Sequence, residues 1–292
     1  MTSFDSLTVI YNPKSSGDAP KLARQFQKDC AKRGLHAVLV PTARAGHATE
    51  IARRAAEQPG TPLVVSVSGD GGYNEVIHGV MSAKRPRGAD RPIVALIAAG
   101  NANDHYRVMH DSTPLVERIE HDIAKPLDIL ELTTDHVTAF AHSYIGFGVT
   151  AKASAKLNQS SKTLSGEISS VVRAVWQQQP FRVTTNGHTK HYTSLVCANI
   201  NQMAKVVKFA DSTNARDGYF ELIEHETLSL GALLFGWLRR NKAVAYYKQL
   251  SFTTDTLTAQ LDGDTITLAV KAPVTVTVRC RKHALRSYYA NA

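Results

Sequence analysis

The first 128 residues alternate between short apolar runs and segments of helical spacing, and this alternation restricts the fold more than any other feature. The apolar runs have the length of buried strands and lie at 7–11, 37–40, 63–67 and 93–97. The segments with helical periodicity lie at 20–33, 46–57 and after residue 72. Such alternation favours a mostly parallel sheet covered by helices. We therefore predict an N-terminal doubly wound α/β domain over residues 1–128.

The pattern changes after about Leu127, where Thr, Val and Ile alternate with polar residues in short runs. These runs lie at 128–132, 137–142, 181–185, 193–200, 219–223, 251–256, 266–270 and 274–280. Asp-Gly and Asn-Gly pairs separate several of them, as is typical of hairpin turns. The pattern predicts an antiparallel β domain over residues 129–280, with helices at 165–178 and 228–248.

Composition limits the environment and the partners of the chain. The 292 residues carry a formal net charge of +9, which favours polyanions such as nucleotides, nucleic acids or anionic lipid headgroups without choosing among them. The three cysteines have no metal-ligand spacing, and the twelve histidines show no zinc pattern. The N-terminus shows no signal peptide and no apolar run is long enough to span a bilayer. These features predict a cytoplasmic protein.

Three loops that follow predicted strands have unusual sequences. They are Asn12-Pro13-Lys14-Ser15-Ser16-Gly17, Ser68-Gly69-Asp70-Gly71-Gly72-Tyr73-Asn74-Glu75 and Gly100-Asn101-Ala102-Asn103-Asp104. In open α/β sheets, ligands bind beyond the carboxyl ends of the strands. Glycines allow close approach of the backbone, and N–H groups at a helix start face anions. The loops therefore predict a phosphate-binding site, although neither a P-loop nor a Rossmann fingerprint is present.

These loops, with two later turns, resemble motifs of the diacylglycerol kinase catalytic family, which includes bacterial soluble lipid kinases and sphingosine kinases. Residues 10–17 resemble its NPxSG segment, 68–75 its GGDGTxNE segment and 100–104 its GTxND segment. Residues 216–220 resemble its DGxx turn, and 261–264 its DGE turn. The resemblance implies an ATP-binding α/β domain, a β-sandwich domain for the lipid substrate, and a C-terminal segment, 281–292, that returns to the first domain.

The resemblance also implies a function and its residues. The function is ATP-dependent transfer of the γ-phosphate to a lipid hydroxyl, most simply that of diacylglycerol, with Mg²⁺ and transient attachment to a membrane surface. The ATP-site residues would be Asn12, Pro13, Lys14, Ser15, Ser16, Thr42, Ser68, Gly69, Asp70, Gly71, Gly72, Tyr73, Asn74 and Asn101. Asp70 would hold Mg²⁺, and Asn214, Asp217 and Tyr219 would hold a second metal ion. Asp264 would be the catalytic base, with Asp262 beside it. Whether the protein forms a homodimer is left open, and nucleic acid is not an expected partner.

The motifs also depart from the family pattern. Gly72 and Asn101 stand where the family has Thr, Ser68 where it has Gly, and Asp264 where it has the longer Glu. These departures leave two alternatives open. One is a nucleotide- or lipid-binding regulator with weakened catalysis. The other is an enzyme related to NAD kinases, which share a GGDG loop.

Overall fold

The structure is a computed structural model and describes residues 4–15, 18–100, 103–121, 123–148, 180–203, 207–208, 214–226 and 245–290. The chain divides into two compact units, which are Met1–Ile129 with Lys282–Ala292, and Leu130–Arg281. The residues from Lys282 onward therefore belong to the same unit as the N-terminus. The predicted class, an α/β part followed by an antiparallel β part, is confirmed.

The first unit contains a parallel sheet. Its strands are β1 (Ser6–Tyr11), β2 (Ala37–Pro41), β3 (Pro62–Ser68) and β4 (Ile93–Ala98). Its helices are α1 (Ala19–Ala31), α2 (His47–Ala56), α3 (Asp70–Met81), α4 (Asp104–Met109) and α5 (Leu115–His121). The strand order is β2-β1-β3-β4, and every neighbouring pair is parallel. The last residues of β18 (Val274–Ser287) extend this sheet, because Arg286 pairs with Ile93 in parallel.

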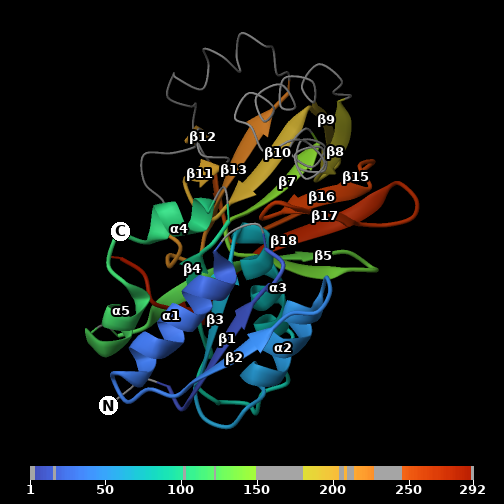
Figure 1. Cartoon of the computed structure of the whole chain (residues 1–292). Helices are drawn as coiled ribbons and strands as arrows, with labels where there is room; N and C mark the ends of the chain where they lie inside the picture. The colour runs from blue at the N-terminus through green and yellow to red at the C-terminus, as the bar shows by residue number, and fades with distance from the viewer. Residues whose placement is uncertain are drawn as a thin grey trace. The chain divides into compact units, whose positions relative to one another are not determined.

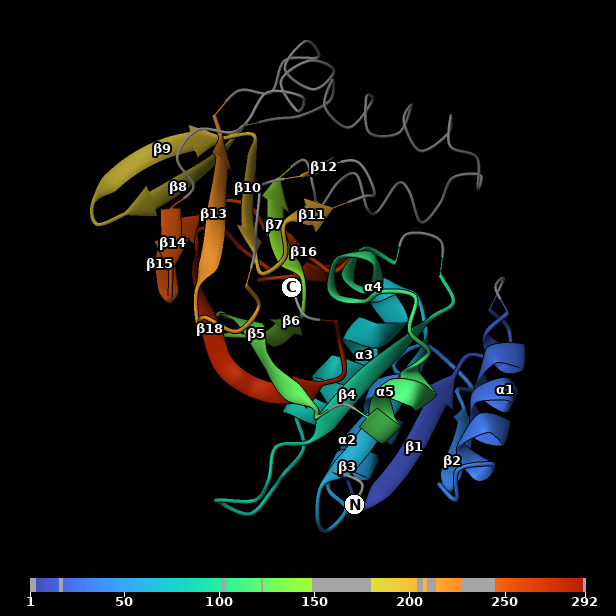
Figure 2. The same cartoon turned by 90° about the vertical axis from the view of Figure 1, so that its left-hand side faces the viewer.

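Helices cover both faces of this sheet (Figures 1 and 2). One face packs against α1 and α5 in a single apolar cluster that includes Val9, Val65, Phe26 and Ile119. The other face lies against α2 and α3. The buried positions of α1 recur every three or four residues, at Ala19, Ala23, Phe26 and Cys30, as the helical periodicity predicts.

The close packing of α2 against α3 depends on Gly79. A Cβ atom added to this glycine would lie 2.3 Å from the carbonyl oxygen of Thr49 and 2.7 Å from the Cβ of Ala52. Because both atoms belong to the rigid part of α2, a side-chain rotation could not relieve the contact. A glycine inside a helix is unfavourable by itself, so its place in α3 reflects this close approach.

Replacing Gly79 by Ala is therefore expected to destabilise the protein by about 2 kcal/mol. Overpacking a close contact costs about 1–3 kcal/mol, which exceeds the gain of up to about 1 kcal/mol in helix propensity. Urea unfolding followed by circular dichroism measures the change. Ser82→Ala, at the C-terminal end of the same helix, is the control and should stay within about 0.5 kcal/mol of the wild type. A Gly79→Ala protein as stable as the control would contradict the packing argument.

The second unit is built from antiparallel strands. They are β6 (Thr138–Ala141), β7 (Tyr144–Gly148), β8 (Phe181–Thr185), β9 (His188–Tyr192), β10 (Ser194–Ala198), β13 (Phe220–His225), β14 (Ala245–Tyr247), β15 (Gln249–Thr254), β16 (Thr258–Leu261) and β17 (Asp264–Thr267). Two short strands, β11 (Gln202–Met203) and β12 (Val207–Lys208), pair with each other. β5 (Lys125–Thr133) enters the unit from the first one and pairs with β6.

One apolar cluster joins two layers of strands in this unit. The first layer has the order β14-β13-β10-β7-β16-β17, and in the second β9, β8, β15 and β18 are neighbours. Inward-facing residues of both layers, such as Phe147 and Phe220 from the first and Phe252 and Val276 from the second, belong to the same cluster. Along β18, buried and solvent-facing residues alternate from Val274, as the sequence pattern predicts for a strand with one covered face.

Several details of the predicted elements are corrected by the structure. The helix predicted at 228–248 is wrong at its end, because Ala245–Tyr247 forms β14 and pairs with β13. The remainder of that segment and the helix predicted at 165–178 lie outside the described residues. β9 was not predicted, since its sequence, HTKHY, is almost entirely polar, as suits an exposed edge strand. No helix among the described ranges is both long and apolar enough to cross a bilayer.

Candidate active site

The loops after β3 and β4 meet through two glycines. A Cβ atom on Gly100 would lie 2.4 Å from the Cα of Gly69, so this backbone contact leaves no room for a side chain. The amide of Ala99 also donates a hydrogen bond to the carbonyl of Ser68, at 2.8 Å. Two of the three predicted loops are therefore in direct contact, at the carboxyl edge of neighbouring parallel strands.

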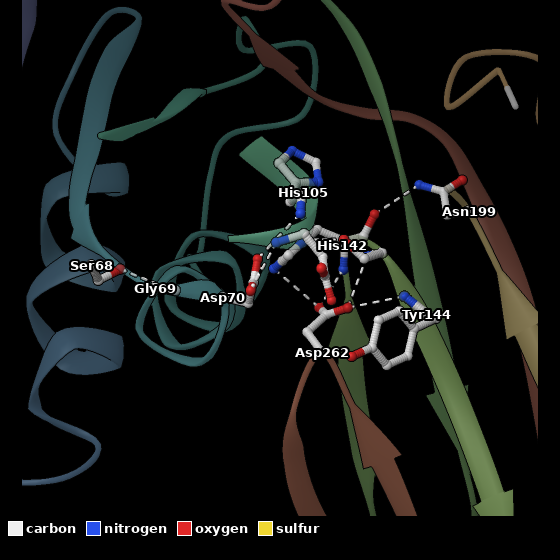
Figure 3. A network of polar contacts seen from close by, with 10 residues as sticks. Ser68, Gly69, Asp70, His105, His142, Tyr144, Asn199 and Asp262 are labelled. Carbon is white, nitrogen blue, oxygen red and sulfur yellow. Dashed lines mark hydrogen bonds and ion pairs between the residues drawn. The ribbon is translucent and has the colours of Figure 1, made fainter. Parts of the chain in front are cut away.

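Asp70 connects the second loop to the helix that follows the third. It is the first residue of α3, and its carboxylate accepts hydrogen bonds from the backbone N–H groups of Asp104 and His105, at 3.0 and 3.2 Å (Figure 3). The carboxylate thus binds the amino end of α4, where N–H groups have no partner within the helix. The neighbouring Tyr73 is buried and its ring lies 5.3 Å from that of His105. Asp70 is therefore held against the amino end of α4.

A pocket of about 370 Å³ within the first unit opens between the loop after β1, the loop after β2 and the loop after β3. It is lined by five of the predicted nucleotide-binding residues, namely Asn12, Lys14, Thr42, Ser68 and Gly72. Four others, Pro13, Ser15, Gly69 and Gly71, lie next to the lining residues in the chain. Tyr73 and Asn74 are buried in the body of α3, so their side chains support the loop from beneath. Ser16 and Asn101 lie outside the described residues.

The pocket wall carries charged and hydrogen-bonding groups. Lys14 and Arg44 supply two cations, and Arg44 is paired with Glu50 at 2.5 Å. The side chain of Asn12 accepts a hydrogen bond from the backbone N–H of Lys14, at 2.8 Å, which fixes the turn that carries the lysine. Arg44 and Ser66 also line the pocket but were not predicted, because no phosphate-binding pattern includes them. Glu75, the last residue of the second predicted loop, lines it as well.

In the second unit, Asp262 is the centre of a fully buried polar network. Its carboxylate accepts three backbone hydrogen bonds, from His142 at 2.7 Å and from Ser143 and Tyr144 at 2.9 Å each (Figure 3). The Nε2 atom of His142 lies 3.3 Å from the same carboxylate, and the other ring nitrogen lies 2.7 Å from the hydroxyl of Ser143. A carboxylate has about four lone-pair positions, and the three backbone N–H groups occupy three of them. This arrangement holds a turn in place and leaves the carboxylate buried, out of reach of a substrate.

Asp264 has a different environment. Asp262 and Gly263 form a two-residue hairpin turn between β16 and β17, and both have positive φ, as a type I′ turn requires. Asp264 is the first residue of β17 and is exposed to solvent. Of the two predicted catalytic carboxylates, only Asp264 is therefore accessible to a substrate.

The turn at 214–219, predicted to hold a second metal ion, is closed by its own hydrogen bonds. The carbonyl of Asn214 accepts N–H groups of Arg216 and Asp217, at 2.6 and 3.2 Å, and the carboxylate of Asp217 accepts the N–H of Tyr219 at 2.8 Å. Since the Asn214 carbonyl has only two lone pairs, it would have to exchange a partner to bind a cation. Nearby, burial and secondarily the charge of Asp217 raise the pKa of Glu221 to about 7.

No group of three or more acidic, histidine or cysteine side chains within the described part of the chain is arranged to hold a metal ion. The first predicted Mg²⁺ ligand, Asp70, fits the oxygen chemistry that Mg²⁺ prefers, which usually combines one or two carboxylates with phosphate oxygens. The residues of the first unit therefore suit a Mg²⁺ ion that arrives with a nucleotide better than a metal site built from protein alone.

Comparison with known proteins agrees with this arrangement. Residues 6–136 match the diacylglycerol kinase catalytic domain. The chain is 25% identical over 237 residues to a diacylglycerol kinase of Staphylococcus carnosus, covering 77% of this chain and 74% of that protein. It is 24% identical over 229 residues to a diacylglycerol kinase of Bacillus subtilis, covering 74% and 72%.

The fold has a solved counterpart as well. A crystal structure described as a diacylglycerol kinase of Bacillus anthracis superimposes with a TM-score of 0.71 and 18% identity, covering 99% of this chain and 98% of that one. At this identity the likeness shows the fold alone. It agrees with the two-part α/β and β fold described above. Residues 6–136 are thus similar to the diacylglycerol kinase catalytic domain, and the relatives that match more of the chain are diacylglycerol kinases.

Proposed function

We propose that this protein is an ATP-dependent lipid kinase that converts diacylglycerol to phosphatidic acid. The observation that carries the proposal is the pocket beside β1 and β3, where loops distant in sequence bring together Asn12, Lys14, Thr42, Ser68 and Gly72. The relatives named as diacylglycerol kinases support the choice of substrate. The first unit would bind ATP and the second the lipid.

Each part of the reaction has a residue that suits it. In the proposed step, the lipid hydroxyl oxygen bonds to the γ-phosphorus, the bond from that phosphorus to ADP breaks, and the hydroxyl proton passes to Asp264. Lys14 and the start of α3 would stabilise the phosphates, since cations and helix N-termini attract anions. Mg²⁺ would neutralise phosphate charge beside Asp70. The second metal site at Asn214, Asp217 and Tyr219 stays a prediction.

The lipid substrate also bears on where the protein works. Diacylglycerol is insoluble in water, so the proposal includes transient attachment to a membrane surface. The net charge of +9 supports this, because each basic residue near an anionic membrane contributes roughly 1 kcal/mol of attraction. The homodimer stays a prediction.

The direct test is to incubate the purified protein with Mg²⁺, labelled ATP and mixed micelles containing diacylglycerol. We expect labelled phosphatidic acid. No labelled product from diacylglycerol, monoacylglycerol or sphingosine would refute the lipid kinase and favour the binding regulator. Labelled NADP, formed with NAD as the acceptor, would favour the alternative related to NAD kinases.

Replacing Lys14 by Met is expected to raise the KM for ATP about tenfold, because a hydrogen bond to a charged group contributes about 1.5–3 kcal/mol. Steady-state kinetics at varied ATP measures the change. Lys32→Met is the matched control: it removes an exposed lysine near the end of α1, away from the pocket. Equal KM values for ATP in the two variants would show that Lys14 does not contribute to ATP binding.

A further inference from the structure

Ser68 and Gly72 compete for one volume in the pocket wall. Ser68 ends β3 and Gly72 lies in the first turn of α3. A Cβ atom on Gly72 would lie 2.6 Å from the Cβ of Ser68 and 2.8 Å from its hydroxyl oxygen. The Cβ position is set by the backbone, so no rotamer of Ser68 relieves the contact. A side chain at either position therefore excludes one at the other without a shift of the backbone.

The hydroxyl of Ser68 is held in the pocket by two partners. It lies 2.7 Å from the hydroxyl of Ser66 and donates to the carbonyl of Gly69 at 3.0 Å. A serine hydroxyl has one proton and two lone pairs, and the hydroxyl hydrogen can rotate. When a phosphate oxygen arrives, Ser68 can turn its proton from the Gly69 carbonyl to the phosphate, while Ser66 continues to donate to Ser68. Ser66 is itself buried, so it can hold the Ser68 oxygen in position.

From this geometry we propose that Ser68 supplies the phosphate-binding hydroxyl of the loop, and that residue 72 is glycine to make room for it. The loop GGDGT, which this segment resembles, has its hydroxyl at the position of Gly72 and glycine at that of Ser68. Serine at position 68 and glycine at position 72 are then a single paired change, which places the hydroxyl at the end of β3 instead of in the first turn of α3. The inference rests on the proposed function only in taking the ligand to be a nucleotide phosphate.

A set of variants tests this paired change. Ser68→Ala removes the hydroxyl but keeps the Cβ atom, and Ser68→Gly also frees the space. Gly72→Thr introduces the steric conflict, and the double variant Ser68→Gly/Gly72→Thr moves the hydroxyl to the helix. Ser82→Ala, at the far end of α3, is the control that removes a hydroxyl outside the pocket. The affinity for ADP with Mg²⁺ is measured by calorimetry without lipid, and thermal unfolding reports folding.

We expect Ser68→Ala and Ser68→Gly to bind ADP about tenfold more weakly, the typical effect of losing one hydrogen bond to a charged group. Gly72→Thr should bind still more weakly and unfold at a lower temperature. The double variant should return to within about threefold of the wild-type affinity, and Ser82→Ala should match the wild type. Such non-additivity is the mark of two residues that share one space.

Three results would overturn the proposal. They are unchanged ADP affinity in Ser68→Ala, a double variant as weak as the product of the two single effects, and no ADP binding by the wild type. Because binding is measured without lipid, the outcome is separate from that of the kinase assay. A protein that binds ADP through Ser68 but phosphorylates no lipid would refute the function alone, whereas lipid phosphorylation with no effect of Ser68→Ala would refute this inference alone.

Discussion

Replacing Asp264 by Asn is expected to lower kcat about 10²- to 10⁴-fold, the usual range for loss of a general base. Asn has nearly the same shape but cannot take the proton of the lipid hydroxyl. Because Asp264 is exposed at the start of β17, its replacement should leave the thermal unfolding temperature unchanged. The KM for ATP should also stay within about threefold, since the pocket that contains Lys14 does not include Asp264.

Two further variants show whether the effect belongs to the carboxylate at this position. Asp264→Glu lengthens the side chain by about 1.5 Å and restores the acid found in the family turn, so at least about a tenth of the activity should remain. Asp135→Asn removes another exposed carboxylate of the second unit and should have no effect. An Asp264→Asn enzyme with more than about a tenth of the wild-type kcat would exclude Asp264 as the base.

Replacing Asp262 by Ala is expected to lower the free energy of unfolding by about 4 kcal/mol. The change leaves the buried N–H groups of His142, Ser143 and Tyr144 without their acceptor, and each such loss costs about 1–3 kcal/mol. Ala also tolerates the positive φ of residue 262 less well than Asp, by about 1 kcal/mol. Urea unfolding followed by circular dichroism measures the loss.

The neighbouring carboxylate gives a matched control, because Asp264→Ala changes the same hairpin at an exposed position and should alter stability by less than about 0.5 kcal/mol. The stability loss of Asp262→Asn should lie between those of Asp262→Ala and Asp264→Ala. Its amide oxygen can still accept hydrogen bonds, and Asn tolerates positive φ. A stability loss below about 1 kcal/mol for Asp262→Ala would show that the network contributes little to the fold.

The contrast between these two aspartates also qualifies the sequence prediction. In the sequence they are equivalent members of an Asp-Gly-Asp turn, and both were predicted to be catalytic. In the structure the carboxylate of Asp262 is buried and accepts three backbone hydrogen bonds, whereas that of Asp264 faces solvent. The catalytic prediction therefore rests on Asp264, and Asp262 supports the hairpin that carries it. The partner of Asp262, His142, has no signal in the sequence, because it lies 120 positions from Asp262 along the chain.

Other elements also differ in how well the sequence predicts them. The four parallel strands and the first three helices were predicted closely, because strong apolar periodicity marks them in the sequence. The end of the segment at 228–248 was predicted wrongly, since the run AYY carries no period-two pattern. It forms the strand β14 because it pairs with β13. Arg44 and Ser66 also needed the structure, because neither belongs to a pattern and both reach the pocket only when β1, β2 and β3 lie side by side.

The sequence alone determined the alternation of elements, the glycine-rich loops at the ends of strands and the family that these loops resemble. These features are local, since periodicity and backbone freedom depend on residues a few positions apart. Only the tertiary structure decided which carboxylate is exposed and which residues line the pocket. Those properties depend on atoms that are distant in the chain and meet only after folding, so no stretch of sequence contains them.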